Sequence, residues 1–501
     1  MNVSTIEAPP TTALGILRRL GPGLIIAGSI VGSGELIGAT TAGAKAGATL
    51  LWLIVLGCVI KVFVQVEFGR YVIATGHTSM DGMNETPGPR LKMSWLFWYW
   101  LVMFLISLGQ LGGIVGGVGQ ALAISLPLTQ AGRAYNESAS QRTAEVFDLY
   151  ARRDSLSDKE RQEKEARIEI LEAALKDNAT GSREQFYWAT IITILTAAVL
   201  VAGRYGLIQW VSTFLVASFT LVTVIDLTLL QMEPQWAIGW ADLLAGLKFQ
   251  LPAQGDGVRT ALQTFGIIGV GANELIQYPY WCSEKGYARF CGPRDATPEW
   301  ADRARGWLRV LRWDAWCSML VYTFATIAFY LLGAAILGRL KLVPEGPEMI
   351  RTLSTMYQPI FGRWTQVLFL FGAFAVLYST FFVANAGHAR VCSDALRVFG
   401  FRQDAAQKQR MVAILSGVFP FVCLMVYLAY AMPAELVLAS GAMQAIMLPM
   451  LAFSAIYFRF RRSDTRIQPT RLWDFCLIAS GVIMAITSIW LVVEQVKAFM
   501  K

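Results

Sequence analysis

Two hydrophobic spans contain nearly the same six residues, Gly32-Ser33-Gly34-Glu35-Leu36-Ile37 in one and Gly271-Ala272-Asn273-Glu274-Leu275-Ile276 in the other. Each motif places a carboxylate at membrane depth, where an ionisable group costs roughly 3 kcal/mol on insertion scales. Such groups persist where they face a cavity, an ion or a partner. Because the neighbouring glycines weaken a helix and free its backbone groups, both spans are predicted to contain broken helices.

The composition around these motifs is that of a polytopic membrane protein. The 501 residues are 55% hydrophobic and only 16% charged, and the mean hydropathy is +0.47. Apolar runs of about 20 residues, the length that crosses a bilayer, recur along most of the chain. We predict eleven spans, at residues 20–43, 48–75, 95–126, 186–203, 207–230, 260–282, 314–338, 364–388, 411–431, 434–458 and 473–496.

The paired motifs lie in the first and sixth of these spans. Spans one to five and six to ten therefore form two corresponding halves, and an odd number of spans in each half gives the halves opposite orientations. Paired broken helices in corresponding positions point to the binding site of a secondary transporter. The predicted fold is an all-α polytopic membrane protein, a LeuT-type inverted repeat of 5+5 helices plus one additional helix, with helices 1 and 6 broken.

The chain divides into consecutive segments. A polar insert interrupts the first half, and its stretch 155–177 is rich in Glu, Lys, Arg, Leu and Ala, which predicts a helical hairpin outside the membrane. The expected segments are an N-terminal cytoplasmic segment (1–19), the first half of the core (20–230) with its external insert (about 130–185), an external interfacial segment (231–259), the second half (260–458), and a cytoplasmic loop with the eleventh helix (459–501).

Basic residues predict the orientation in the membrane. Lysine and arginine are concentrated in the loops after spans six, eight and ten, within residues 285–312, 390–410 and 459–471. The positive-inside rule makes these loops cytoplasmic, so the N-terminus is predicted inside and the C-terminus outside. The formal charge of +8 is accounted for by these loops and does not indicate a nucleic-acid partner. With no cleavable signal peptide visible, we expect an integral protein of a prokaryotic inner (plasma) membrane, a monomer whose partners are the lipid bilayer and a small cation.

Other function classes receive little support from the sequence. None of the seven cysteines falls in the large external loop, so no disulfide framework is implied. The only histidines are His77 and His388, which excludes a His-rich metal site. We find no Ser-His-Asp, metal-His or phosphate-loop arrangement and expect neither an enzyme nor a cofactor.

Further stretches resemble a known family. They are Gly21-Pro22-Gly23-Leu24, Ala42-Gly43-Ala44-Lys45-Ala46-Gly47 before Leu50-Leu51-Trp52, residues 65–76, and Gln444 before Leu448-Pro449. The membrane core, without the insert at 130–185, resembles the Nramp (natural resistance-associated macrophage protein) family of proton-coupled divalent-metal transporters. The resemblance implies movement of a divalent metal ion by alternating access.

The family's binding motifs are changed in this chain. Asp-Pro-Gly-Asn of the family's first span falls on residues 32–35, so Gly32 replaces the metal-binding Asp. Met-Pro-His-Asn of its sixth span falls on residues 271–274, which removes a sulfur ligand that helps select transition metals. A later family His falls on Tyr278, and the acidic group of span three is replaced within Gln110-Leu111-Gly112-Gly113. Oxygen ligands suit harder ions, so Mg²⁺ or Mn²⁺ is the predicted substrate.

Glu35 and Glu274 are the leading candidates for a central site. If both face one cavity, their summed charge of −2 matches a divalent cation, with carbonyls near Gly32 and Gly271 completing an oxygen shell. If they lie close together, one would bind a proton and serve as the coupling group. Further candidates are neutral or peripheral polar residues: Ser33, Asn273, Gln444, Tyr278, Asp226 and Asn385.

Each candidate also has a structural interpretation. The glutamates would cap the second half-helices, where the macrodipole favours a carboxylate by roughly 0.3–1 kcal/mol. Ser33 and Asn273 would satisfy freed backbone groups, Gln444 would bond between helices, and Asp226, near a membrane boundary, would be solvated or paired. Two other functions stay open: binding of an organic cation, with Tyr278, Tyr280 and Trp281 supplying cation–π contacts, and a membrane sensor without transport.

Overall fold

The computed structural model describes residues 6–152, 155–177, 181–202, 205–252, 256–401 and 403–500. These residues are almost entirely helical, apart from two short antiparallel strands, β1 (Arg90–Leu91) and β2 (Met93–Ser94). Within them, eight helical segments are long and apolar enough to cross a membrane. Another apolar helical stretch (Val216–Leu230) falls in the predicted fifth span, and the predicted sixth span is divided into two short helices. The prediction of an all-α polytopic membrane protein is confirmed.

Helices of the first half follow the predicted spans closely. The first span consists of α2, a π-helical stretch (Ser33–Ala39) and α3. The helices are α1 (Ala13–Arg19), α2 (Pro22–Ile30), α3 (Thr40–Ala46), α4 (Leu51–Thr75), α5 (Ser79–Glu85), α6 (Trp95–Ser125), α7 (Gln130–Ala151), α8 (Asp158–Asp177), α9 (Glu184–Val201), α10 (Tyr205–Leu230) and α11 (Trp240–Gly246).

The second half also begins with a broken pair of helices, α12 and α13, and the additional helix α21 follows it. Two helices of this half continue well beyond the predicted spans: α15 begins 16 residues before the predicted start, and α18 ends 11 residues after the predicted end. The helices are α12 (Gly257–Phe265), α13 (Ala272–Lys285), α14 (Tyr287–Cys291), α15 (Pro298–Leu332), α16 (Met349–Ser354), α17 (Gln358–Phe361), α18 (Thr365–Phe399), α19 (Ala405–Ala429), α20 (Pro433–Tyr457) and the additional helix α21 (Arg471–Met500).

The break in the first span is short. α2 begins with a proline at its first position, where the missing N–H is not needed. It ends at Ile30, and Gly32 leaves helical geometry with φ −157° and ψ −104°. The chain then resumes as the π-helix Ser33–Ala39, a rare form that is frequent at functional sites. The predicted break at the first motif is confirmed.

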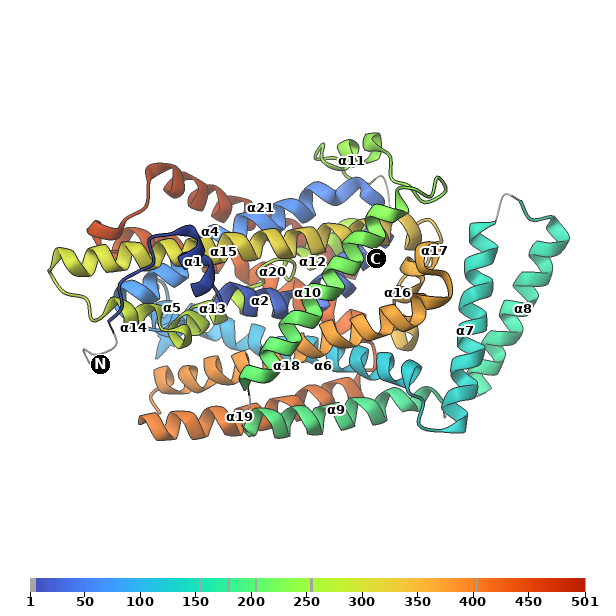
Figure 1. The fold of residues 1–501 in the computed structure, drawn as a ribbon, viewed down its shortest axis with the longest axis horizontal. Coiled ribbons are helices and arrows are strands. Elements are labelled where there is room, and N and C mark those ends of the chain that lie inside the picture. The colour runs from blue at the N-terminus through green and yellow to red at the C-terminus, as the bar shows by residue number, and fades with distance from the viewer. Residues whose placement is uncertain are drawn as a thin grey trace.

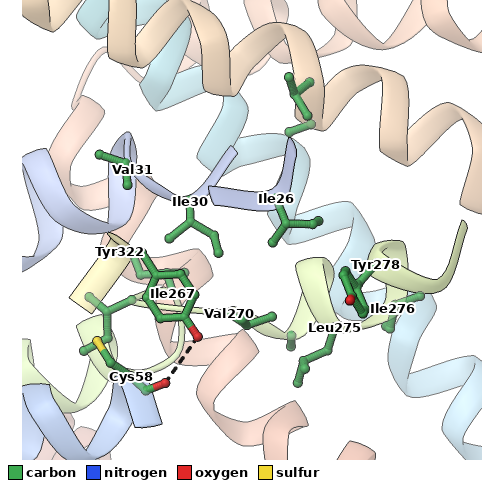
Figure 2. Close-up of a cluster of buried hydrophobic side chains, with 14 of the residues drawn as sticks. Ile26, Ile30, Val31, Cys58, Ile267, Val270, Leu275, Ile276, Tyr278 and Tyr322 are labelled. Atoms are coloured by element: carbon green, nitrogen blue, oxygen red, sulfur yellow. Dashed lines mark hydrogen bonds between the residues drawn. The ribbon is translucent and has the colours of Figure 1, made fainter. Parts of the chain in front are cut away.

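The break in the sixth span is longer, covering residues 266–271 between α12 and α13. Gly269 adopts φ +58°, a left-handed conformation that glycine tolerates. A Cβ there would also lie 3.0 Å from the Tyr322 ring and 3.1 Å from the Cys58 Cα. Figure 2 shows apolar side chains around both breaks, Val31 from the first and Ile267 and Val270 from the sixth. The breaks thus lie inside the packed core.

Long helices surround the two broken ones. α6 packs against α9, α18, α19 and α20, and α15 packs against α4. In Figure 1, α2 and α12 lie inside the bundle, α9 and α19 run together along one side, and α21 lies toward the other. The additional helix α21 packs on α20 and α4. This arrangement encloses the two motifs.

The polar insert is an antiparallel pair of helices, α7 and α8, that projects from one end of the bundle (Figure 1). Ion pairs join the two helices, among them Arg142 to Glu172 at 2.6 Å and Lys164 to Glu145 at 2.9 Å. The Tyr135 hydroxyl donates to Glu348 at 2.6 Å and so ties α7 to the segment before α16. The insert is therefore a folded part of the molecule.

Candidate functional site

Glu35 lies in the first turn of the π-helix and is fully buried. Its Oε1 accepts hydrogen bonds from the Gly269 N–H at 3.3 Å and from the Thr326 hydroxyl at 3.0 Å. Its Oε2 has no hydrogen-bond partner among the atoms that the structure describes. Buried carboxylate oxygens are normally satisfied by a protein group, a water or an ion. One carboxylate oxygen is therefore available to a ligand at the centre of the fold.

Lys61 completes the break in the sixth span. In a continuous helix the Gly269 N–H would bond to the Phe265 carbonyl four residues earlier. Here that N–H donates to Glu35, and the Phe265 carbonyl accepts from the buried Lys61 ammonium. Lys61 also donates to the Ile268 carbonyl at 2.7 Å. The Glu35 carboxylate thus replaces the carbonyl that would accept from Gly269, and the Lys61 ammonium replaces the N–H that would donate to Phe265.

The sequence interpretation missed Lys61, although a signal was present. Lys61 lies in the middle of the predicted second span, and any ionisable residue at that depth is a candidate functional residue. The same span holds Glu67 and Arg70, which are also buried and form an ion pair at 3.1 Å. Glu67 additionally accepts from the Trp473 indole at 2.7 Å. The Glu67–Arg70 pair links α4 to α21, whereas Lys61 faces the breaks.

Glu274 occupies the first turn of α13 and is only partly buried. A methyl group on Gly271 would lie 2.4 Å from Glu274 Oε2 and 2.9 Å from Gln444 Oε1. Both oxygens therefore approach the backbone closely because Gly271 has no side chain. Glu274 interacts electrostatically with Glu35 and Lys61. The formal charges of Glu35, Glu274 and Lys61 sum to −1. The charge of −2 expected for the site from the sequence counted the two glutamates and left out the lysine.

A hydrogen-bonded network connects the neutral candidates. Gln110 donates to the Ser33 hydroxyl at 2.9 Å and accepts from the Gln444 amide at 2.8 Å. Gln444 in turn accepts from the Asn273 N–H at 3.2 Å, and the Asn273 amide donates to Ser107 at 2.7 Å. The structure thus brings Ser33, Asn273 and Gln444 together. Of the connecting residues of α6, Gln110 lies where the resemblance places an acidic group but was not named as a candidate, and Ser107 is revealed only by its proximity in space.

Tyr278 faces a different carboxylate from the glutamate pair. Its hydroxyl donates to Asp314 Oδ2 at 3.0 Å. Asp314 is buried and also accepts from the N–H groups of Gly21 at 2.9 Å and Gly23 at 2.5 Å, at the start of α2. Asp314 therefore holds the first half-helix against α13 and α15. Tyr280 likewise donates to Asp394 at 2.6 Å, so the hydroxyls of both tyrosines serve contacts between helices.

The two weaker candidates, Asp226 and Asn385, lie apart from the two motifs. Asp226 is fully buried, and neither of its carboxylate oxygens has a hydrogen-bond partner within the described part of the chain. The interpretation of Asp226 as solvated or paired is therefore wrong: the side chain of this α10 residue points into the protein. Asn385 donates to the Phe381 carbonyl one turn earlier at 2.7 Å. Neither residue is hydrogen-bonded to the two motifs.

The capping interpretation accounts for part of the arrangement. Both glutamates lie in the first turn of a half-helix, where the macrodipole favours a carboxylate. Capping does not explain all of the Glu35 contacts, because Glu35 also accepts a hydrogen bond from the backbone of the other broken helix. Among the described residues, no group of three or more His, Cys, Asp or Glu side chains is arranged to hold a metal ion. A cation here would rely on carboxylate, amide and carbonyl oxygens and water.

Comparison with known proteins agrees with this geometry. Residues 178–494 match the family model described as natural resistance-associated macrophage protein-like. A mutant of the Eremococcus coleocola manganese transporter superposes with a TM-score of 0.60 at 12% identity, covering 100% of this chain and 92% of that chain. The same transporter with an aromatic bis-isothiourea substituted compound gives 0.58 at 12% identity, covering 99% and 91%.

A second kind of solved structure shares the fold. MhsT in complex with L-phenylalanine superposes with a TM-score of 0.51 at 14% identity, covering 98% of this chain and 100% of that chain. No curated protein matches the sequence significantly. These structural likenesses confirm the fold, and the family model covers more than half of the sequence. The chain belongs to the natural resistance-associated macrophage protein-like (Nramp) family.

Proposed function

We propose that the chain is a secondary-active transporter that moves a divalent metal cation by alternating access around its two broken helices. The unpartnered, buried Oε2 of Glu35 carries this proposal. A desolvated carboxylate oxygen is stabilised by a cation, and Glu274 lies within electrostatic range of it. The family and the fold shared with a manganese transporter support a metal ion as the cargo.

The ligand chemistry favours Mg²⁺ or Mn²⁺. Glu35, Glu274 and the Ser33–Gln110–Gln444 network supply oxygens, which suit these hard ions. Cys58 brings a thiol beside Gly269, since a Cβ on Gly269 would lie 3.6 Å from its Sγ. A soft metal would use that sulfur, whereas Mg²⁺ would not. Cys58→Ser should therefore leave Mg²⁺ and Mn²⁺ uptake unchanged.

Cavities at opposite ends of the broken helices provide access in this proposal. One, of about 410 Å³, is lined by Thr41 of α3, Gln263 of α12 and Glu435 of α20. The other, of about 420 Å³, is lined by Tyr280 and Ser283 of α13 together with residues of α4, α18 and α19. The two glutamate motifs lie between these ends, because α3 and α12 lead to one cavity and α13 leads to the other.

Buried polar groups mark a release route toward the α13 cavity. Both amide atoms of Gln65, the Gln277 Oε1 and both ring nitrogens of His388 have no hydrogen-bond partner among the described atoms. They belong to α4, α13 and α18, which also contribute Val72, Tyr280 and Arg390 to the lining of that cavity. Buried polar groups are normally satisfied by protein or water. We infer that water reaches them when this end opens.

Uptake into reconstituted vesicles tests the proposal. Wild-type protein should accumulate Mn²⁺ and Mg²⁺ in a saturable manner, and Glu35→Gln combined with Glu274→Gln should abolish uptake while the protein remains folded. Glu494→Gln is the matched control, since this glutamate of α21 pairs with Lys497 at 2.8 Å outside the site. Undiminished uptake by the double variant would remove the central site from the proposal, and no uptake by wild type would refute metal transport.

A further inference from the structure

The Lys61 ammonium lies at the carbonyl end of a half-helix. α12 ends at Phe265, and the last carbonyls of a helix have no partners within it. Lys61 Nζ donates to the carbonyls of Phe265 and Ile268, and it lies 4.9 Å from the centre of the Phe265 ring. A helix C-terminus favours positive charge. In inverted-repeat transporters, unwound carbonyls and half-helix C-termini are the groups that coordinate a coupling ion.

The surroundings of this ammonium are those of a cation site. Lys61 is fully buried, and Glu35 and Glu274 both interact with it electrostatically. Glu35 holds the Gly269 N–H that the Phe265 carbonyl would otherwise accept. Removing the ammonium would leave two carbonyls without a donor and two carboxylates without a counter-charge. Buried charges without partners are strongly destabilising, so some other cation would be required there.

We propose that Lys61 is a tethered cation, which fills a monovalent-cation site at the end of α12 and makes the protein independent of a second ion. The side chain acts as a specificity residue: it contributes one fixed positive charge beside the two glutamates. The remaining charge of −1 then attracts one cargo cation. The identity of the cargo rests on the proposed function. The cation requirement of a Lys61 variant does not, because cation binding to purified protein reveals it without transport.

Substitution of the lysine should convert the tethered cation into a free one. Lys61→Met keeps most of the aliphatic stem and removes the charge. In choline chloride its melting temperature should fall by several degrees, and Na⁺, K⁺ or propylammonium at constant ionic strength should restore it, because a ligand that binds the folded state stabilises it. Wild type and Lys61→Arg, which keeps the charge, should show no such dependence.

Lys45→Met is the matched control, since Lys45 pairs with Glu345 at 3.2 Å near the end of α3. The same salts should leave its melting temperature unchanged relative to choline. The test is thermal unfolding of purified protein in detergent, followed without any transport. A Lys61→Met protein with no cation dependence, or one that none of the three cations keeps folded, would overturn the inference. Absence of metal uptake by wild type would refute the proposed function and leave this result standing.

Discussion

The two broken helices carry the same motif but use it differently. In the first span the break is confined to the residues around Gly32, and Glu35 is fully buried with bonds to Gly269 and Thr326. In the sixth span six residues are unwound, and Glu274 is partly exposed beside Gly271. The first glutamate therefore organises the backbone of the opposite break, whereas the second lies against the backbone of its own break. Repetition in sequence does not imply equivalence in role.

Single substitutions of the two glutamates should show the difference between the two breaks most clearly. Glu35→Gln should reduce Mn²⁺ uptake by about 100-fold, since charged hydrogen bonds such as those to Gly269 and Thr326 contribute about 1.5–3 kcal/mol and each 1.4 kcal/mol is tenfold. Glu274→Gln should reduce it by about 10-fold, since it removes a negative charge near the cation but no side-chain hydrogen bond of this kind. Initial rates in vesicles provide the measurement, with Glu494→Gln as control. Equal losses in the two variants would contradict the asymmetry.

Substituting alanine for each of two glycines in the longer break should distinguish an effect on protein stability from an effect on metal binding. Gly269→Ala strains a left-handed residue by about 1–2 kcal/mol and crowds Tyr322 and Cys58, so the melting temperature should fall. Gly271→Ala would displace the Glu274 carboxylate, so uptake should fall more than stability.

Gly76→Ala is the reference for the glycine pair, because Gly76 is left-handed with φ +71° and ψ 2° and a Cβ there would have no atom within 4 Å. It should reproduce the strain of Gly269→Ala without its crowding. A Gly271→Ala protein with normal uptake would show that the Glu274 position is unimportant.

Gln110→Leu should have an intermediate effect, because it removes the link between Ser33 of one break and Gln444 beside the other. Buried partners left unsatisfied cost about 1–3 kcal/mol. We expect a lower melting temperature and weaker Mn²⁺ binding by calorimetry. Gln120→Leu, on the same helix, removes bonds to Gly346 and Ile350 away from the site. It should lower the melting temperature alone, and an equal loss of Mn²⁺ affinity would contradict the assignment.

The smallest effect is expected far from both breaks, at Asp464 in the loop between α20 and α21. The Arg466 side chain, with Arg294 nearby, lowers the pKa of Asp464 from its ordinary 3.8 to about 2. Because the pKa is depressed, the stabilisation is present above about pH 4 and is lost as the pH falls through about 2. Asp464→Asn should lower the melting temperature at pH 7, and the difference from wild type should shrink on acidification. A pH-independent difference would exclude this ion pair as the cause.

The sequence predicted the fold well because periodic hydrophobicity and glycine-flanked glutamates are local signals. The eleven spans correspond to helices or broken pairs of helices, and both breaks lie at the motifs. The side chains that surround the motifs were harder to predict from the sequence. Lys61 could have been found as a charge at membrane depth, but its bonds to Phe265 and Ile268 join residues some 200 positions apart. The buried position of Asp226 depends in the same way on how α10 packs, which its place in the sequence does not reveal.

In the proposed transport cycle, the Asp314 contact with the first half-helix would set the conditions for opening the end near α13. Moving α2 away would break the bonds that the Gly21 and Gly23 N–H groups donate to one buried carboxylate. Without water, that carboxylate would keep only the Tyr278 hydroxyl as a partner, at a large cost in free energy. With water entering at the same moment, each lost bond is replaced and the net cost is modest. In the proposed transport cycle, water entry would therefore have to accompany the movement of α2.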